Sequence, residues 1–258
     1  MSETTKETIQ NQKEQENSFD LLPNAIEIIN VSKTYGSKKV LDRITFSVKK
    51  GTIHGLIGPN GSGKTTTMCM IVKLTPLEEK GNIRVYGKSI KEDSYTNSYI
   101  GFAPSEVDML KEYEVEDYIV DYNILRGLEK KYVLEAIDRS PLDVFRYHKI
   151  KNLSTGWRKI VQIFNITLSQ PEILILDEPF NGLDPEKRRS LFEKLIKMRK
   201  EGKTILISTH ILSDLQKMAD NITMIRSGKT VYNGLITENI EDTYREVFEC
   251  REEENPFV

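Results

Sequence analysis

The sequence predicts an α/β fold whose core is interrupted by a helical segment. Short stretches typical of strands recur in the first third of the chain: IEIINVSKTY, VLDRITFSV, IHGLIG and NIRVYG. Two uninterrupted apolar runs, ILIL after Pro171 and TILIST further on, are typical of strands buried on both faces of a parallel sheet. Between about Val107 and Leu168, aliphatic residues recur at helical spacing with few strand signals, which predicts the insertion.

The composition is that of an ordinary globular protein. Of 258 residues, 38% are hydrophobic and 29% are charged, and the net charge is −2. No apolar run approaches the ~18 residues that a membrane span needs, and the N-terminus lacks the apolar region of a signal peptide. Cys69 and Cys250 are too few for a disulfide framework and lack metal-ligand spacing. We therefore expect a protein of the reducing cytosol.

Charge and sequence complexity change at both ends of the chain. Residues 1–24 are polar and too poor in apolar side chains to offset their ordering entropy, so a disordered arm is expected. Residues 25–235 are expected to form the main domain, with a helical subdomain at about 107–168. Residues 236–258 are acidic and are expected to form a C-terminal helix or tail. The middle is mildly basic, which suits an anionic ligand, although solvated surface charge explains it equally well.

The strongest motif is a glycine-rich segment at residues 58–65, GPNGSGKT, called the phosphate loop below. It matches G-x-x-x-x-G-K-[ST] and stands between a predicted strand and a helical stretch. Glycines let consecutive N–H groups point at phosphate oxygens, and the following helix adds the positive end of its dipole. Lys64 is expected to reach the β- and γ-phosphates, and the Thr65 hydroxyl to ligate Mg²⁺. The residues expected to bind the nucleotide here are Asn60, Gly61, Ser62, Gly63, Lys64, Thr65 and Thr66.

A second motif, ILILDEP, places two acids at the end of an apolar strand. Asp177 suits a role in holding Mg²⁺, and Glu178 can polarise the attacking water. Acids also commonly end strands and cap helices, so this pair is unspecific by itself. With a phosphate loop upstream, we predict Glu178 and Lys64 as catalytic residues, and Thr65 and Asp177 as metal ligands.

With both motifs in this order, the sequence resembles the ATP-binding cassette (ABC) family, specifically the ATP-binding subunit of a membrane transporter. The likeness runs from about Ile26 to Gly234. It implies a P-loop NTPase core with a mixed sheet flanked by helices, an antiparallel β subdomain and an inserted α-helical subdomain. It also implies ATP and Mg²⁺ as ligands, and no nucleic acid partner. The C-terminal stretch ENIEDTYREVF is similar to that of single-cassette subunits for drug or antimicrobial-peptide export or immunity.

The resemblance assigns roles to five further residues. It implies that Tyr35 stacks on the adenine and that His210 is the switch histidine, a third catalytic residue, that contacts the γ-phosphate. Ser154 and Gly156 match the family signature, which faces the nucleotide held by the opposite subunit, and Asp184 matches the residue that couples the two sites. The alternatives are a packing tyrosine, a structural histidine and a tight turn capped by Asp184.

The sequence departs from the family pattern at two places. In the signature segment, residues 153–157 (LSTGW), Thr155 replaces a Gly and Trp157 replaces a Gln; Lys159 and Ile160 replace the usual polar and basic pair. In IGFAPSE, Ser105 stands where the family usually has a Gln that touches Mg²⁺ or the attacking water. Serine is about two bonds shorter, so we expect Ser105 to affect hydrolysis more than ATP binding.

The resemblance implies a transport-coupled ATPase subunit. Two cassettes are expected to pair head to tail around ATP, as a homodimer or a heterodimer, and to drive an integral membrane permease from the cytoplasmic face of the cell membrane. Export is favoured over import because the C-terminal region is short. Two alternatives stay open: a low-turnover nucleotide-binding switch, and a soluble cofactor-assembly ABC ATPase.

Overall fold

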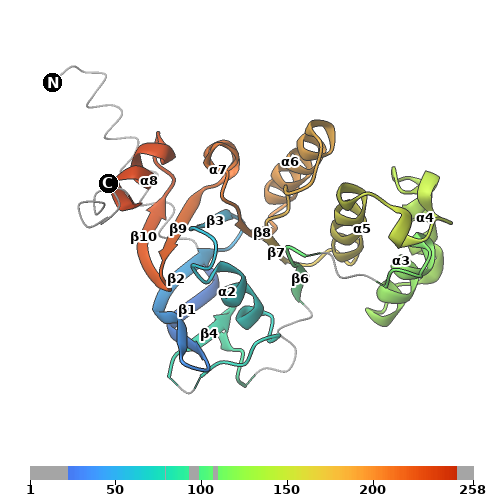
Figure 1. Cartoon of the computed structure of the whole chain (residues 1–258). Coiled ribbons are helices and arrows are strands. Elements are labelled where there is room, and N and C mark those ends of the chain that lie inside the picture. Colours follow the sequence, from blue (N-terminus) through green and yellow to red (C-terminus); the bar gives the residue numbers. More distant parts are fainter. Residues whose placement is uncertain (1–22, 79, 93–98, 107–109, 249–258) are drawn as a thin grey trace.

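In the computed structural model, two β-sheets lie together and a group of helices stands apart at one side (Figure 1). The structure describes residues 23–78, 80–92, 99–106 and 110–248. Its strands are β1 (Asn24–Tyr35), β2 (Lys38–Lys49), β3 (Ile53–Ile57), β4 (Asn82–Val85), β5 (Lys88–Ser89), β6 (Ile100–Ala103), β7 (Ile173–Asp177), β8 (Thr204–Ser208), β9 (Asn221–Arg226) and β10 (Lys229–Leu235). Its helices are α2 (Lys64–Ile71), α3 (Val115–Leu125), α4 (Lys130–Asp138), α5 (Thr155–Leu168), α6 (Pro185–Lys200), α7 (Leu212–Met218) and α8 (Ile240–Phe248), with 3₁₀ turns η2 (Asp143–Phe145) and η3 (Ile150–Asn152).

The two sheets differ in strand direction. The larger sheet has the order β10-β9-β3-β8-β7-β6; strands β9, β3, β8, β7 and β6 run parallel, and β10 pairs antiparallel with β9. The smaller sheet, β2-β1-β4-β5, is antiparallel throughout. The predicted α/β class is therefore confirmed, with both the mixed sheet and the antiparallel sheet that the resemblance implied.

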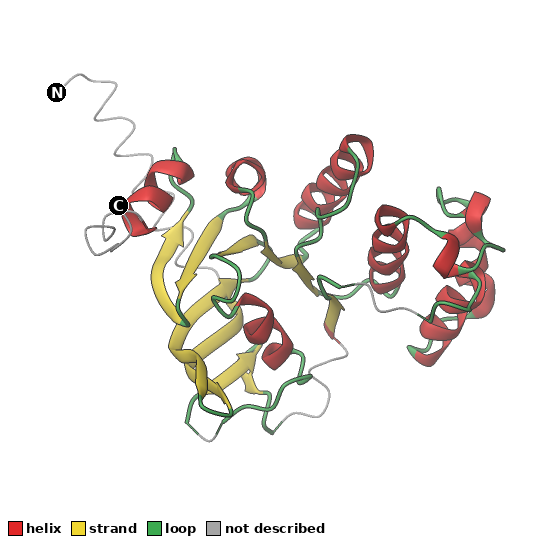
Figure 2. Cartoon of the chain, in the orientation of Figure 1, coloured by secondary structure: helices red, strands yellow, loops and turns green. Residues whose placement is uncertain are grey.

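Alternation along the central strands builds two separate cores. In β7, Ile173 and Ile175 pack with α2 and the antiparallel sheet, whereas Leu174 and Leu176 pack with α6 and α7 on the other face. Figure 2 shows the helices on both sides of the mixed sheet. All five β7 residues are buried, as expected of a strand covered on both faces. The carboxyl end of this strand is thereby held rigidly at Asp177.

The inserted helices have a core of their own. Helices α3, α4 and α5 pack through a third apolar cluster that includes Val115, Ile119, Val133 and Val161. Trp157 packs against this cluster, with its ring 4.5 Å from that of Phe145. The single tryptophan of the chain is therefore partly buried against its own subdomain, with the Lys187 ammonium of α6 4.7 Å from its ring centroid.

The two ends of the chain are only partly described. Strand β1 begins at Asn24, one residue before the expected start of the main domain, because its register with β2 extends to Lys49. The expected N-terminal arm otherwise lies outside the described residues, as do residues 107–109, residues 249–258 and Cys250. Helix α8 lies within the expected C-terminal segment. Among the described residues, no helix has the length and apolar character needed to cross a membrane.

Candidate functional site

The phosphate loop joins the end of β3 to the start of α2, and its turn depends on glycine. Gly61 and Gly63 have φ angles of 79° and 109°, and Gly63 is the N-cap residue of α2. A Cβ at Gly63 would lie 2.3 Å from a methyl carbon of Leu41, and one at Gly58 would lie 2.2 Å from the carbonyl oxygen of Ile225. Side chains are thus excluded where the loop passes closest to its neighbours.

Lys64 is buried at the base of this loop. Its Nζ donates to the carbonyl oxygens of Gly58 (2.7 Å) and Pro59 (3.3 Å). Burial lowers the pKa of the Lys64 ammonium, and the nearby carboxylates of Glu178 and Asp177 oppose that shift. A cation held under backbone N–H groups at a helix N-terminus is suited to an anionic ligand such as a phosphate chain.

Asp177 connects three elements at the carboxyl edge of the mixed sheet. Its Oδ2 accepts a hydrogen bond from the Thr65 hydroxyl at 2.6 Å, and its Oδ1 accepts one from the Ser208 hydroxyl at the end of β8. The same Ser208 oxygen accepts the backbone N–H of Glu178 at 2.9 Å. Asp177 and Ser208 are both buried, so this network is held in a low dielectric.

Glu178 and His210 meet beside this network. His210 Nδ1 lies 3.0 Å from Glu178 Oε2, and the histidine side chain is exposed, whereas that of Glu178 is mostly buried. Glu178 has a φ of 46°, an unusual conformation for a residue with a Cβ. Backbone conformations of this kind concentrate at functional sites. Two residues that are 32 positions apart in the sequence are thus paired by the adjacency of β7 and β8.

These residues line one cavity of about 340 Å³, called the nucleotide pocket below. It contains nine of the expected site residues: Asn60, Gly61, Gly63, Lys64, Thr65, Thr66, Asp177, Glu178 and His210. Ser105 also lines it, at the position where the family pattern has a Gln, together with Val40 and Asn181.

Sequence reasoning missed Ser208, Val40 and Asn181 as site residues. Ser208 stands two positions before His210 at the end of TILISTH, and this closeness in sequence was the available signal. Asn181 lies three positions before Asp184, and that short spacing was the signal available for it. Val40 lies in an ordinary strand pattern, which carries no such signal.

Two expected ligand residues do not line the nucleotide pocket. Tyr35, at the end of β1, is half exposed, and the ammonium of Lys33 lies 5.3 Å from its ring centroid. Ser62 is buried within the phosphate loop, and among the described residues its hydroxyl has no hydrogen-bond partner. Tyr35 is therefore partly exposed at the surface beside the Lys33 ammonium, while Ser62 contributes its backbone to the loop.

The signature segment and Asp184 also lie outside the pocket of their own chain. Ser154 caps α5 by accepting the N–H of Trp157, and Asp184 caps α6 by accepting that of Lys187 at 2.9 Å. The Lys187 ammonium lowers the pKa of Asp184. A Cβ at Gly156 would lie 2.9 Å from the carbonyl oxygen of Gly182, so the two segments are in close contact. Ser154 is exposed and available to a ligand from outside the chain.

The residues around Asp177 fit a magnesium ion. Thr65 and Asp177 offer only oxygen atoms, the ligands that Mg²⁺ prefers, and they already lie 2.6 Å apart. Within the described segments, no cluster of three or more His, Cys, Asp or Glu residues could hold a metal by itself. Mg²⁺ usually binds through one or two protein ligands plus substrate phosphates. This donor set is therefore suited to a metal that arrives with a nucleotide.

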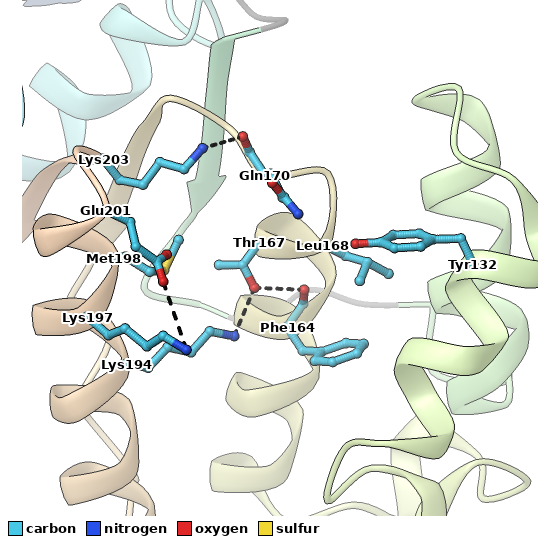
Figure 3. Close-up of a pocket in the computed structure, with 10 residues that line it drawn as sticks. All are labelled: Tyr132, Phe164, Thr167, Leu168, Gln170, Lys194, Lys197, Met198, Glu201 and Lys203. Atoms are coloured by element: carbon cyan, nitrogen blue, oxygen red, sulfur yellow. Dashed lines mark hydrogen bonds and ion pairs between the residues drawn. The ribbon is translucent and has the colours of Figure 1, made fainter.

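A larger groove of about 520 Å³ lies elsewhere, bounded by α5, α6 and α4 (Figure 3). Lys194 donates to the Thr167 hydroxyl at 3.0 Å, and Lys203 donates to the carbonyl oxygen of Gln170 at 2.8 Å. Burial lowers the pKa of Lys194. No phosphate-loop residue lines this groove, so it is separate from the nucleotide pocket.

Comparison with known proteins agrees with this geometry. A family model described as ABC transporter matches residues 41–181. An uncharacterised ABC transporter ATP-binding protein of Methanocaldococcus jannaschii is 36% identical over 83% of this chain and 78% of that protein. Nod factor export ATP-binding protein I of Sinorhizobium fredii is 33% identical over 84% of this chain and 65% of that protein. A linearmycin resistance ATP-binding protein of Bacillus subtilis is 32% identical over 81% of this chain and 68% of that protein.

Solved structures share the same fold. An ATP-binding subunit of an ABC transporter superposes with a TM-score of 0.76 at 27% identity, covering 88% of this chain and 94% of that one. A dimeric ATP-binding cassette in a post-hydrolysis state, bound to ADP and Pi, superposes with a TM-score of 0.74 at 22% identity, covering 82% and 99%. The resemblance inferred from the motifs is confirmed: this chain belongs to the ABC transporter family, as an ATP-binding subunit with ATPase activity.

Proposed function

We propose that two copies of this chain close around ATP and drive a membrane transporter, which is an exporter. The observation that carries the proposal is the separation within one chain of two halves of a site. Lys64, Asp177 and Glu178 line the nucleotide pocket, whereas exposed Ser154 and the Gly156 segment lie outside it. A second copy can bring its signature segment to the open side of the pocket. The dimeric cassette of the same fold supports this arrangement.

Each pocket residue then has a role in hydrolysis. The Lys64 ammonium binds the β- and γ-phosphate oxygens, and Glu178 orients the attacking water, since its carboxylate is within reach of the same cavity. His210 holds the Glu178 carboxylate through their 3.0 Å contact. Ser154 of the second copy donates to the γ-phosphate. The half-exposed ring of Tyr35 stacks on the adenine, where stacking contributes about 1–3 kcal/mol.

Thr65 and Asp177 would hold Mg²⁺ in this scheme. The metal would neutralise charge on the phosphates as the terminal group leaves. Ser208 supports both of these functions, because its hydroxyl bonds the Asp177 carboxylate and the backbone N–H of Glu178. The position of the metal ligand and that of the water-orienting residue are therefore set by one hydroxyl.

The dimer is tested with the Glu178→Gln variant, which keeps the shape of the side chain and removes its charge. We expect turnover to fall by a factor of at least about 10², the size of general-base contributions, with ATP binding retained. Light scattering after size exclusion should show a doubling of molar mass on adding Mg-ATP. An unchanged mass despite demonstrated ATP binding would remove the homodimer from the proposal and favour a different cassette as partner.

A low-turnover switch is the second candidate function, and Ser105 is the observation that favours it. Its short side chain lines the pocket where the family pattern has a longer Gln. The two functions differ in rate. Turnover of the parent chain that stays far below 1 s⁻¹ even with its permease would favour the switch, since enzymes typically turn over at about 1–10³ s⁻¹.

We place the working complex on the cytoplasmic face of the membrane, with the cassettes bound to an integral permease. The export direction is supported by the relatives named for Nod factor export and linearmycin resistance. Cells that carry the complete transporter with Glu178→Gln should retain the transported compound inside. Reduced uptake in those cells would show the opposite direction of transport.

A further inference from the structure

Lys159 is a buried lysine that the roles above do not use. It lies on α5, three positions after Gly156, and its exposed fraction is only 2%. Its Nζ donates to the carbonyl oxygens of Pro104 at 2.9 Å and Ser105 at 3.0 Å. Within the described part of the chain, no carboxylate forms a salt bridge with it. Burying a cation without a paired anion is costly, so its place calls for an explanation.

The two carbonyl groups belong to the segment that follows β6 and enters the nucleotide pocket. Ser105 lines that pocket, and Pro104 precedes it directly. Helix α5 is also pressed against β6 itself, since a Cβ at Gly101 would lie 3.2 Å from the carbonyl oxygen of Ile166. The ammonium of Lys159 is therefore a second point of attachment between α5 and this edge of the mixed sheet, and the one nearer the pocket.

The Lys159 side chain is expected to carry its positive charge near pH 7. Burial lowers the pKa of Lys159 to about 8, while the carboxylates of Asp177 and Glu178 favour its charged form. The lysine is therefore mostly protonated at pH 7 and can donate to two acceptors at once. Hydrogen bonds from an ionised donor are roughly twice as strong as neutral ones.

We propose that Lys159 is a positioning residue for ATP hydrolysis, which fixes the Pro104–Ser105 segment relative to the signature helix α5. The inference rests on the proposed function, because α5 begins beside Ser154, which is expected to contact the nucleotide held by the other copy. Through Lys159, the arrival of that nucleotide at one end of α5 is transmitted to Ser105 in the chain's own pocket. The segment with the shortened side chain is thus held in place through its backbone.

The test compares Lys159→Met with Lys194→Met. Methionine keeps an unbranched side chain, one atom shorter than lysine, and removes the charge and the donors. Lys194 is the matched control, because it is also a lysine with a pKa lowered by burial and a hydrogen bond to α5, but in the separate groove of Figure 3. Three quantities are measured in the intact chain: kcat for Mg-ATP, the Kd for Mg-ATP in a Glu178→Gln background, and Tm.

For Lys159→Met we expect kcat to fall about 10- to 100-fold, the loss that a displacement of about 1 Å causes in an active site. The Kd should stay within about twofold of the parent value, and Lys194→Met should leave kcat and Kd unchanged. Any of three results would overturn the proposal. In Lys159→Met, kcat could fall less than threefold, or Kd could weaken by the same factor as kcat falls. In Lys194→Met, kcat could fall as much as in Lys159→Met.

If Lys159→Met shows no cooperative unfolding transition, and so does not fold, Lys159→Gln replaces it in the test. It retains a polar group in the buried site but is one bond shorter, so the same separation of kcat from Kd is expected. A failure of the chain to form the proposed dimer would be seen separately, because the molar mass of Glu178→Gln with Mg-ATP is measured in a chain that keeps Lys159. The kcat ratio of Lys159→Met to the parent does not depend on that outcome.

Discussion

Replacing Ser208 with alanine should destabilise the chain and slow it at the same time. The Ser208 hydroxyl donates to the Asp177 carboxylate and accepts the backbone N–H of Glu178 at 2.9 Å, and Ser208 is fully buried. A hydrogen bond to a charged group contributes about 1.5–3 kcal/mol, and an unsatisfied buried N–H costs about 1–3 kcal/mol. These contributions overlap, so we expect the free energy of unfolding to fall by about 2–4 kcal/mol.

The assay is denaturation by urea and by heat, followed by circular dichroism. For a chain of this size, about 2–4 kcal/mol corresponds to a fall in Tm of about 4–16 °C. Ser169→Ala is the matched control, because the Ser169 hydroxyl is buried but has no hydrogen-bond partner in the part of the chain that the structure describes. We expect the control to retain the parent stability within about 0.5 kcal/mol.

Catalysis provides the second readout for Ser208→Ala. Loss of the hydroxyl frees the Glu178 backbone and one oxygen of Asp177, so kcat should fall by at least about tenfold, the effect of losing an outer-shell hydrogen bond. Ser208→Thr keeps the hydroxyl and should retain more activity. If Ser208→Ala and Ser169→Ala have the same stability and the same kcat, the bridging role that we assign to Ser208 is wrong.

Three further predictions follow from the same geometry. Thr65→Val should weaken Mg-ATP binding at least about tenfold, while the Kd for ATP without Mg²⁺ stays within about twofold, measured by titration calorimetry. Gly63→Ala should abolish nucleotide binding and lower stability by about 2–4 kcal/mol, because φ is 109° and a Cβ would lie 2.3 Å from a leucine methyl. Gly87→Ala, with φ 77° and no described atom beyond the adjoining residues within 4 Å of the added Cβ, should cost about 1–2 kcal/mol. Burial lowers the pKa of His54 to about 3. As pH falls below ~6.5, the unfolded chain therefore binds a proton at His54 that the folded chain does not bind. Between pH 7 and pH 5 the free energy of unfolding of the parent should fall by about 2 kcal/mol more than that of His54→Gln.

Each of these has a clear opposing result. An equal loss of Mg-ATP and metal-free ATP binding in Thr65→Val would remove that hydroxyl from the metal site. Equal stabilities of Gly63→Ala and Gly87→Ala would show that the loop gives way to a side chain. Parallel pH profiles for the parent and His54→Gln would mean that the buried imidazole does not lose its proton on folding.

The phosphate loop and the acidic pair could be predicted because their chemistry is local. Glycines at fixed spacing, followed by Lys64 and Thr65, are needed wherever backbone N–H groups surround phosphates, whatever the rest of the chain does. In the same way, a continuous apolar run that ends in Asp177 predicts a buried parallel strand with an acid at its carboxyl end. Short strand-like stretches predicted β1 to β4 and continuous apolar runs predicted β7 and β8, whereas β5, β6, β9 and β10 were not predicted.

The contacts between distant segments could not be predicted in this way. Ser208 reads as the end of an ordinary apolar strand, and it becomes a site residue only because β8 lies beside β7 in register with Asp177. Lys159 reads as a polar residue on a helix, and its burial depends on how α5 packs on β6. Hydrophobic periodicity shows which face of an element is buried, but not which neighbour covers it.

The sequence by itself determined the family, the phosphate-binding chemistry and the residue types that can hold a metal and orient water, because these depend on short spacings along the chain. Only the tertiary structure decided that Ser208 bonds both Asp177 and Glu178, and that the buried Lys159 donates to the carbonyl oxygens of Pro104 and Ser105. The physical reason is that strand order and helix packing set these distances, and they arise from burial of apolar surface summed over the whole chain rather than from any one motif.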